Sequence, residues 1–440
     1  MTQNTSLTRQ QKEAVGLLSI GTFLEYFDLM LYVHMAVLLN DLFFEPSDPF
    51  TSSINVAFAF CSTYLLRPVG AVLFGWIGDN IGRRHTVIIT TAMMSISCVV
   101  MATLPTYAEI GVTASVVVTI CRMIQGMSSM GEIVGATLYV TEITKPPIQY
   151  PAVSTIGIFG NFGTFTALAV ASLVTSTGFN WRIAFWIGAI VAVVGAVART
   201  KLRETPEFAD AKLRIKNKIE ALGFDPNKIN SNPIVQKKVR IKSVIALFLL
   251  ECGWPVCFYF IYFHCGVILK NQFHYSPEQI IAHNLIISIV QCFKSIIWAY
   301  LSRYIYPLIL MKFIVTIFTL LTLMTPYLLN NFTSPLELLI FQCIMVVFVL
   351  SYPSALPIVL KHLPVFKRFT LLSWGHAMPR VLVYVVTSFG FVYLTHYFGN
   401  FGIFVIVIPT ITGFAFGINH FGNLEIEAGN YPLKNLFQVS

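Results

Sequence analysis

Long apolar runs alternate with short polar connections along almost the whole chain of 440 residues. A helix needs about 20 mostly apolar residues to cross the hydrocarbon core of a bilayer. Membrane β-strands would instead give segments of about ten residues with alternating polarity, so the continuous runs favour helices. We expect twelve membrane-spanning helices, near residues 16–42, 53–76, 86–104, 111–141, 151–176, 181–199, 242–269, 279–302, 308–330, 335–360, 370–397 and 400–422.

The composition agrees with this pattern. Hydrophobic residues make up 56% of the chain and charged residues only 11%, whereas about a quarter of the residues of a soluble domain are charged. The apolar surface must therefore face lipid. The sequence predicts an all-α integral membrane protein.

The distribution of Lys and Arg predicts the orientation, because positively charged loops stay in the cytoplasm. Twelve spans with both termini in the cytoplasm place most of the basic residues on that side. We therefore expect a multi-pass protein of the inner (plasma) membrane whose basic surface faces anionic lipid. No soluble basic domain is available for nucleic acid, and we expect a monomer.

A polar, basic stretch near residues 201–241 divides the spans into six and six. We expect an N-terminal six-helix half at 1–200, a cytoplasmic linker at 201–241 and a C-terminal six-helix half at 242–440. Transporters built from two such halves bind their substrate near the bilayer midplane, between the halves.

The connection between the second and third spans is short, charged and rich in glycine. Gly75, Asp79, Gly82, Arg83 and Arg84 fall in the pattern G-x-x-x-D-x-x-G-R-R. This pattern, at this place, resembles the signature of the major facilitator superfamily. The resemblance implies that these five residues take part in gating at the cytoplasmic side.

Further segments resemble the metabolite:proton symporter branch of that superfamily, which includes proline/betaine, ketoglutarate, citrate and shikimate carriers. They are Phe23–Asp28, Leu66–Ala71, Arg122–Gly126, Gly131–Glu132 and Glu204–Phe208. The resemblance implies a major facilitator fold and transport of a small polar metabolite by alternating access.

The corresponding turn of the second half departs from the signature. Residues 299–306 contain no aspartate and no Gly-Arg-Arg. We therefore expect the cytoplasmic side of the second half to be held together in another way.

Ionisable residues within spans are candidates for function, because each costs at least ~2.5–3.5 kcal/mol at the centre of a membrane helix. Glu25, Asp28 and Tyr32 share one face of the first helix. We expect Asp28, with Glu25, to carry the coupled proton, and Tyr32 to contact substrate. The alternative for Asp28 is a structural ion pair or an interhelical hydrogen bond.

Polar residues also form a stripe along the fourth span. Arg122 could bind a substrate carboxylate in a bidentate manner, or could pair with Asp28 or Glu132. Gln125 lies on the same stripe and is a second substrate-binding candidate. Glu132 and Arg67 are gating candidates, and the alternative for Arg67 is that it snorkels to the interface.

The second half offers aromatic and charged candidates. Glu251 and Trp254, beside Pro255, are expected to line a cavity. Trp254, with Tyr259 and Tyr262, could enclose a quaternary ammonium group, although such residues more often simply pack.

Three basic side chains of the second half remain. They could favour an anionic substrate, or could pair with acidic residues of the first half, which leaves betaine and carboxylates both open. These residues are Lys294, His376 and Arg380.

No motif predicts covalent chemistry, since the chain has neither a phosphate loop nor a zinc-protease or nucleophile-elbow motif. We expect no enzyme, no cofactor and no metal site. The predicted function is proton-coupled symport of a small polar metabolite, either proline/betaine or a small carboxylate. The alternatives are a facilitative uniporter or exchanger of the same fold, and a non-transporting membrane sensor.

Overall fold

The computed structural model describes residues 6–45, 48–80, 83–129, 132–176, 180–201, 240–364 and 368–432, and some side chains inside the helices are not described. Every regular element in these ranges is helical. The predicted linker lies almost entirely outside the described residues.

In the part of the chain that the structure describes, the first six spans, which we call the N-terminal half, form nine helices. They are α1 (Arg9–Phe43), α2 (Pro49–Leu65), α3 (Arg67–Asn80), α4 (Arg83–Thr103), α5 (Tyr107–Ile110), α6 (Val112–Ser128), α7 (Glu132–Ile143), α8 (Gln149–Ser176) and α9 (Arg182–Lys201).

The remaining spans, which we call the C-terminal half, are also helical in the described ranges. They are α11 (Ile241–Phe258), the π-helical segment η2 (Tyr259–His264), α12 (Cys265–Gln272), α13 (Pro277–Leu301), α14 (Pro307–Asn331), α15 (Pro335–Val347), α16 (Leu356–Lys361), α17 (Arg368–Phe398), the 3-10 turn η4 (Gly399–Gly402) and α18 (Ile403–Glu427).

The twelve expected spans are present as this all-helical fold, and the major difference from expectation is that several spans are interrupted. The second span breaks at Leu66, two residues before Pro68, because proline has no N–H to donate to the carbonyl of Tyr64, four residues earlier. The seventh continues past Pro255 as the π-helical η2. Eight runs of described residues are long and apolar enough to cross a membrane, and one of them, Leu371–Glu427, contains two helices.

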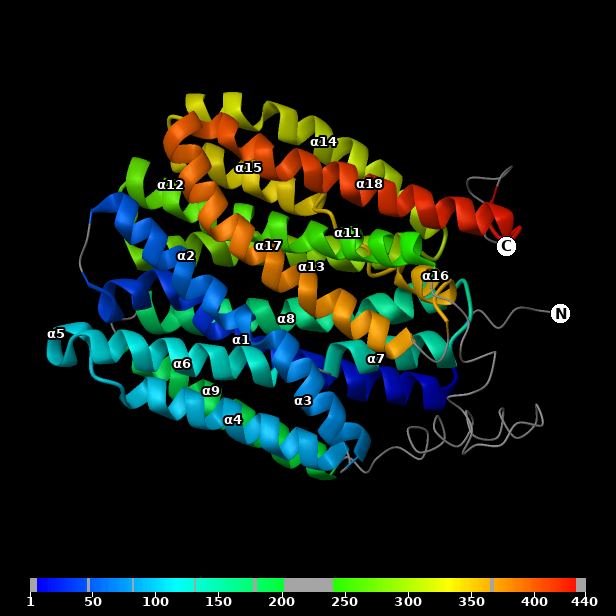
Figure 1. The fold of residues 1–440 in the computed structure, drawn as a ribbon, viewed down its shortest axis with the longest axis horizontal. Helices are drawn as coiled ribbons and strands as arrows, with labels where there is room; N and C mark the ends of the chain where they lie inside the picture. The colour runs from blue at the N-terminus through cyan, green and yellow to red at the C-terminus, as the bar shows by residue number, and fades with distance from the viewer. Residues whose placement is uncertain are drawn as a thin grey trace.

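The long helices run side by side along the longest axis of the molecule (Figure 1). The start of α1 and the end of α18 lie at one end, which is also where α9 ends and α11 begins. We call it the linker end, and the other, where α1 ends and α5 lies, the opposite end.

Glycines allow the close helix approaches within the N-terminal half. A Cβ atom added at Gly126 of α6 would collide with the carbonyl oxygen of Thr63 on α2, and one added at Gly163 of α8 would collide with the backbone of Phe23 on α1. Small residues at such contacts let membrane helices pack backbone to backbone. The halves meet mainly where α8 packs on α13 and α2 packs on α17.

Candidate functional site

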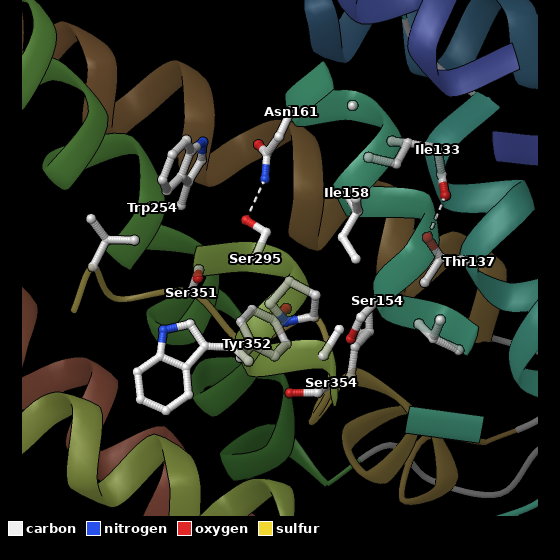
Figure 2. Close-up of a pocket in the computed structure, with 18 of the residues that line it drawn as sticks. Ile133, Thr137, Ser154, Ile158, Asn161, Trp254, Ser295, Ser351, Tyr352 and Ser354 are labelled. Atoms are coloured by element: carbon white, nitrogen blue, oxygen red, sulfur yellow. Dashed lines mark hydrogen bonds between the residues drawn. The ribbon is translucent and has the colours of Figure 1, made fainter. Parts of the chain in front are cut away.

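A cavity of about 200 Å³ lies between the two halves (Figure 2). The N-terminal half lines it with α1, α7 and α8, and the C-terminal half with α11, α13, α14, α17 and the connection between α15 and α16. Trp254 and Phe258 line the part of the cavity near the middle of the bundle. Other lining residues lie close to the linker end of their helices: Ser154, Ala299 and Leu372. The cavity therefore extends from mid-bundle toward the linker end.

An aromatic layer separates the cavity from the opposite end. The ring centroid of Phe60 on α2 lies 4.3 Å from that of Phe263 and 4.9 Å from that of Tyr384. The rings of Tyr64 and Tyr384 are 4.1 Å apart. Since these contacts join the two halves, they close the bundle on this side of the cavity.

A buried carboxylate forms the charged centre of the C-terminal wall. Arg380 Nη1 of α17 donates to Glu251 Oε2 of α11 over 2.9 Å, and Tyr352 donates its hydroxyl to Glu251 Oε1 over 2.6 Å. His376 Nδ1 lies 3.4 Å from Glu251 Oε2. The expectation that Glu251 lines a cavity is confirmed by its position, and Arg380 pairs with this residue of its own half.

A chain of side-chain hydrogen bonds crosses from one half to the other in the cavity wall. Asn161 of α8 donates from Nδ2 to Ser295 Oγ of α13 over 2.8 Å, as Figure 2 shows. Gln291 donates from Nε2 to Asn161 Oδ1 over 2.8 Å and accepts from the hydroxyl of Tyr262 over 2.7 Å. Sequence reasoning missed this chain, although the i, i+4 spacing of Gln291 and Ser295 placed two polar groups on one helix face.

Lys294 lies on the same helix face and lines the cavity. It is only 7% exposed, and its Nζ is 5.9 Å from the ring centroid of Trp254. Within the described ranges it has neither an ion pair nor a hydrogen bond to a side chain. Trp254, a predicted substrate contact, also lines the cavity (Figure 2).

The other substrate-binding candidates lie elsewhere. Arg122 is 1% exposed, its guanidinium carbon is 3.7 Å from the ring centroid of Tyr32, and it donates to the carbonyl oxygen of Ala59. Gln125 Nε2 is 3.6 Å from Cys98 Sγ. These contacts place Arg122, Gln125 and Tyr32 together inside the N-terminal half, and none of the three lines the cavity.

The predicted proton carriers lie on α1. Asp28 is helical, but its side chain is outside the described part. Glu25 is half-buried, and Tyr26 and Met30 of the same helix line the cavity. The coupling role of Asp28 and Glu25 stays a prediction.

The predicted gating residues are described only in part. Gly75 and Asp79 lie in α3, and Arg83 and Arg84 lie in α4. The side chains of these four residues and of Glu132, and the whole of Gly82, lie outside the described part of the structure. Their roles stay predictions.

Arg67, in contrast, is fully described. It is 5% exposed, and its guanidinium carbon is 4.6 Å from the ring centroid of Tyr64. It is therefore held against the aromatic layer at the contact between the halves.

The second half has its own buried cluster at the linker end. Glu425 near the end of α18 accepts from the hydroxyl of Tyr306 over 2.8 Å, lies 2.6 Å from His362 Nε2 and accepts from Lys361 Nζ over 3.2 Å. Burial, and then the Glu425 carboxylate, raises the pKa of Tyr306, so its hydroxyl remains a donor. Since Tyr306 belongs to the turn that lacks the signature, this cluster connects that turn to α16 and α18.

Two curated relatives align with part of the chain. The proline/betaine transporter of Salmonella typhimurium is 29% identical over 275 residues, which cover 61% of this chain and 54% of that protein. The inner membrane metabolite transport protein YhjE of Escherichia coli is 34% identical over 225 residues, covering 48% of this chain and 50% of that protein. The matched segment thus spans about half the length of each relative.

Solved structures resemble the whole fold at low sequence identity. The proton:xylose symporter XylE bound to 6-bromo-6-deoxy-D-glucose superimposes with a TM-score of 0.68 at 15% identity, over 92% of this chain and 94% of that one. The human organic anion transporter MFSD10 gives 0.64 at 14% identity, over 94% and 100%. Residues 18–378 match the model of the Major Facilitator Superfamily. The chain belongs to this superfamily, as its signature turn indicates.

Proposed function

We propose that the protein is a secondary transporter that moves a small polar metabolite by alternating access, with protons as the coupling ion. The observation that carries the proposal is the charged cavity between the two halves. A site with walls from both halves can be exposed first at one end and then at the other when the halves rock.

The contacts between the halves support this mechanism. Near the opposite end the aromatic layer and the ion pair between Asp41 and Lys270 hold the halves together. At the linker end Arg368 Nη1 is 3.8 Å from Glu142 Oε1. The long pair at the linker end, and the extension of the cavity toward it, fit a site that exchanges substrate with that side. We propose that this side is cytoplasmic and that both termini lie there, in the inner membrane.

Proton coupling rests on the acidic residues of α1. Glu251 is already engaged within its own half, because it pairs with Arg380 and accepts from the hydroxyl of Tyr352. Asp28 and Glu25 lie on a helix that contributes Tyr26 and Met30 to the cavity wall. Protonation of Asp28 or Glu25 would therefore depend on whether substrate occupies the cavity. One of the solved structures that resemble this fold is named as a proton:xylose symporter, which fits proton coupling.

The test is uptake into proteoliposomes with an acidic exterior. Labelled proline, betaine, ketoglutarate and citrate are supplied with and without an uncoupler. We expect one class to accumulate, and we expect the uncoupler to collapse the accumulation. Equilibration without accumulation would instead establish a uniporter or exchanger, and binding without any flux would indicate a sensor.

A further inference from the structure

We propose that Lys294 binds the carboxylate of the substrate and that the substrate is a small organic anion and not a zwitterion. The inference rests on the proposed function, because it assigns the chemical class of ligand to the same cavity. It follows from the charge balance of the cavity wall, from the burial of Lys294 and from its neighbours.

Among the side chains that the structure describes, the charge balance of the cavity wall leaves one cation unpaired. The described lining residues include the basic side chains of Lys294 and Arg380, the imidazole of His376, and one carboxylate, Glu251. Arg380 is the partner of Glu251 at 2.9 Å. Among the described residues, Lys294 is therefore the charge of the wall that remains for a ligand.

The burial of Lys294 makes this unpaired charge significant. A cation in the interior of a membrane bundle is costly unless it is paired. Its Nζ lies 5.9 Å from the Trp254 ring, which is at the outer limit for attraction between a cation and an aromatic face. A ligand carboxylate reaching Lys294 from the cavity would supply a charge-assisted hydrogen bond.

The neighbours of Lys294 would complete the site. Gln291 and Ser295 lie three residues before and one residue after Lys294, and both are bonded to Asn161 of the other half. A carboxylate at Lys294 would therefore sit beside polar groups that join the halves, so its binding and release would affect their contact. The indole of Trp298, fixed by a hydrogen bond to the Val347 carbonyl, adds an aromatic wall for the rest of the ligand.

The aromatic cage for a quaternary ammonium group that was expected from Tyr259 and Tyr262 is not part of the described cavity wall. Tyr259 and Tyr262, which could have formed an aromatic cage, are 3% and 2% exposed and do not line the cavity. Their hydroxyls are occupied by Ser388 and Gln291. The cationic end of a zwitterion would meet Lys294 and a carboxylate already held by Arg380, so an anion is the better match.

The experiment compares ligands of one shape and different charge. The full-length protein in detergent is titrated by calorimetry with nicotinate and nicotinamide, with benzoate and benzamide, and with proline and betaine. We expect at least one simple carboxylate to bind about tenfold or more tightly than its amide and than both zwitterions. The amide has no charged acceptor for Lys294, and a zwitterion adds a cationic group that Lys294 repels. Amides or zwitterions that bind as tightly as the carboxylates, or carboxylates that do not bind, would overturn the proposal.

Variants then assign the effect to Lys294. Lys294→Gln should lose carboxylate affinity by about tenfold or more, and Lys294→Arg should retain most of it. Lys312→Gln, at an exposed lysine of α14 that does not line the cavity, should behave as wild type. Unchanged affinity in Lys294→Gln would reject the assignment. If this variant does not fold, the comparison of carboxylates with amides on the wild type still decides the ligand class.

Binding and flux separate the two proposals. Carboxylate binding that depends on Lys294, without uptake into proteoliposomes, would overturn only the transport function. Uptake of proline or betaine that is unaffected by Lys294→Gln would overturn only the inference about the ligand.

Discussion

Lys270 and Asp41 join the two halves of the protein by an ion pair, with 2.9 Å between Lys270 Nζ and Asp41 Oδ1. The pair connects the end of α12 to the end of α1 at the opposite end of the bundle. Arg368 and Glu142 connect α17 to α7 at the linker end, over 3.8 Å. Under alternating access these two pairs would break in different conformations.

Asp41→Asn should lower the population of the conformation that is closed at the opposite end. Both side chains are more than a third exposed, at 37% and 44%, so solvent screens the pair. We expect the ratio of conformations to change by less than about fivefold. The measurement is the distance between spin labels at the exposed Val112 and Leu336, which lie in different halves at this end.

The charge swap Asp41→Lys with Lys270→Asp is the control for that prediction. It restores the pair with its sign reversed and should recover the wild-type distance distribution. A swap that behaves like the single variant would show that the ion pair does not contribute to closure.

Glu251→Gln should destabilise the fold strongly. The change leaves the buried guanidinium of Arg380 without its partner, and breaking a buried pair from one side typically costs about 3–5 kcal/mol. Thermal unfolding in detergent measures the effect. The double variant Glu251→Gln, Arg380→Gln should regain part of the loss, because no charge is then left alone. A double variant that melts at a lower temperature than Glu251→Gln alone would contradict this account.

Glu425→Ala should loosen the linker end of the C-terminal half. The carboxylate accepts from Tyr306 and Lys361 and contacts His362, and hydrogen bonds to a charged group contribute about 1.5–3 kcal/mol each. We expect a clear drop in the melting temperature, whereas Glu427→Ala, at an exposed residue two positions later, should melt like wild type. Equal melting of the two variants would show that the cluster does not replace the missing signature.

The spans could be predicted well because the thickness of a bilayer sets a minimum length for an apolar run that crosses it. The expected run at 279–302 is observed as Pro277–Leu301, and that at 308–330 as Pro307–Asn331. The breaks within spans were harder to predict. Pro255 indicated one of them, but whether the chain kinks, stops or winds into a π-helix depends on the helices packed around it.

The site could be predicted only in part because a helix pattern shows which residues share a face and not what that face meets. Arg122 and Gln125 do share a face, but Arg122 meets the carbonyl of Ala59 on α2. Glu251 and Trp254 were found because charged or large aromatic residues in apolar helices are conspicuous, and both line the cavity. Asn161 gave no such signal, since its importance comes from Ser295, which lies 134 residues away in the chain.

Asp28→Asn should abolish accumulation driven by a proton gradient while leaving substrate exchange measurable. The amide keeps the size of the side chain but cannot take up and release a proton, so net coupled transport stops and binding does not. Uptake into proteoliposomes with an acidic exterior is compared with counterflow of labelled substrate at equal pH on both sides. Glu13→Gln, at an exposed position of the same helix, is the matched control and should still accumulate substrate. If Asp28→Asn accumulates substrate as wild type does, the coupling carboxylate is another residue, and Glu25 is the next to be replaced.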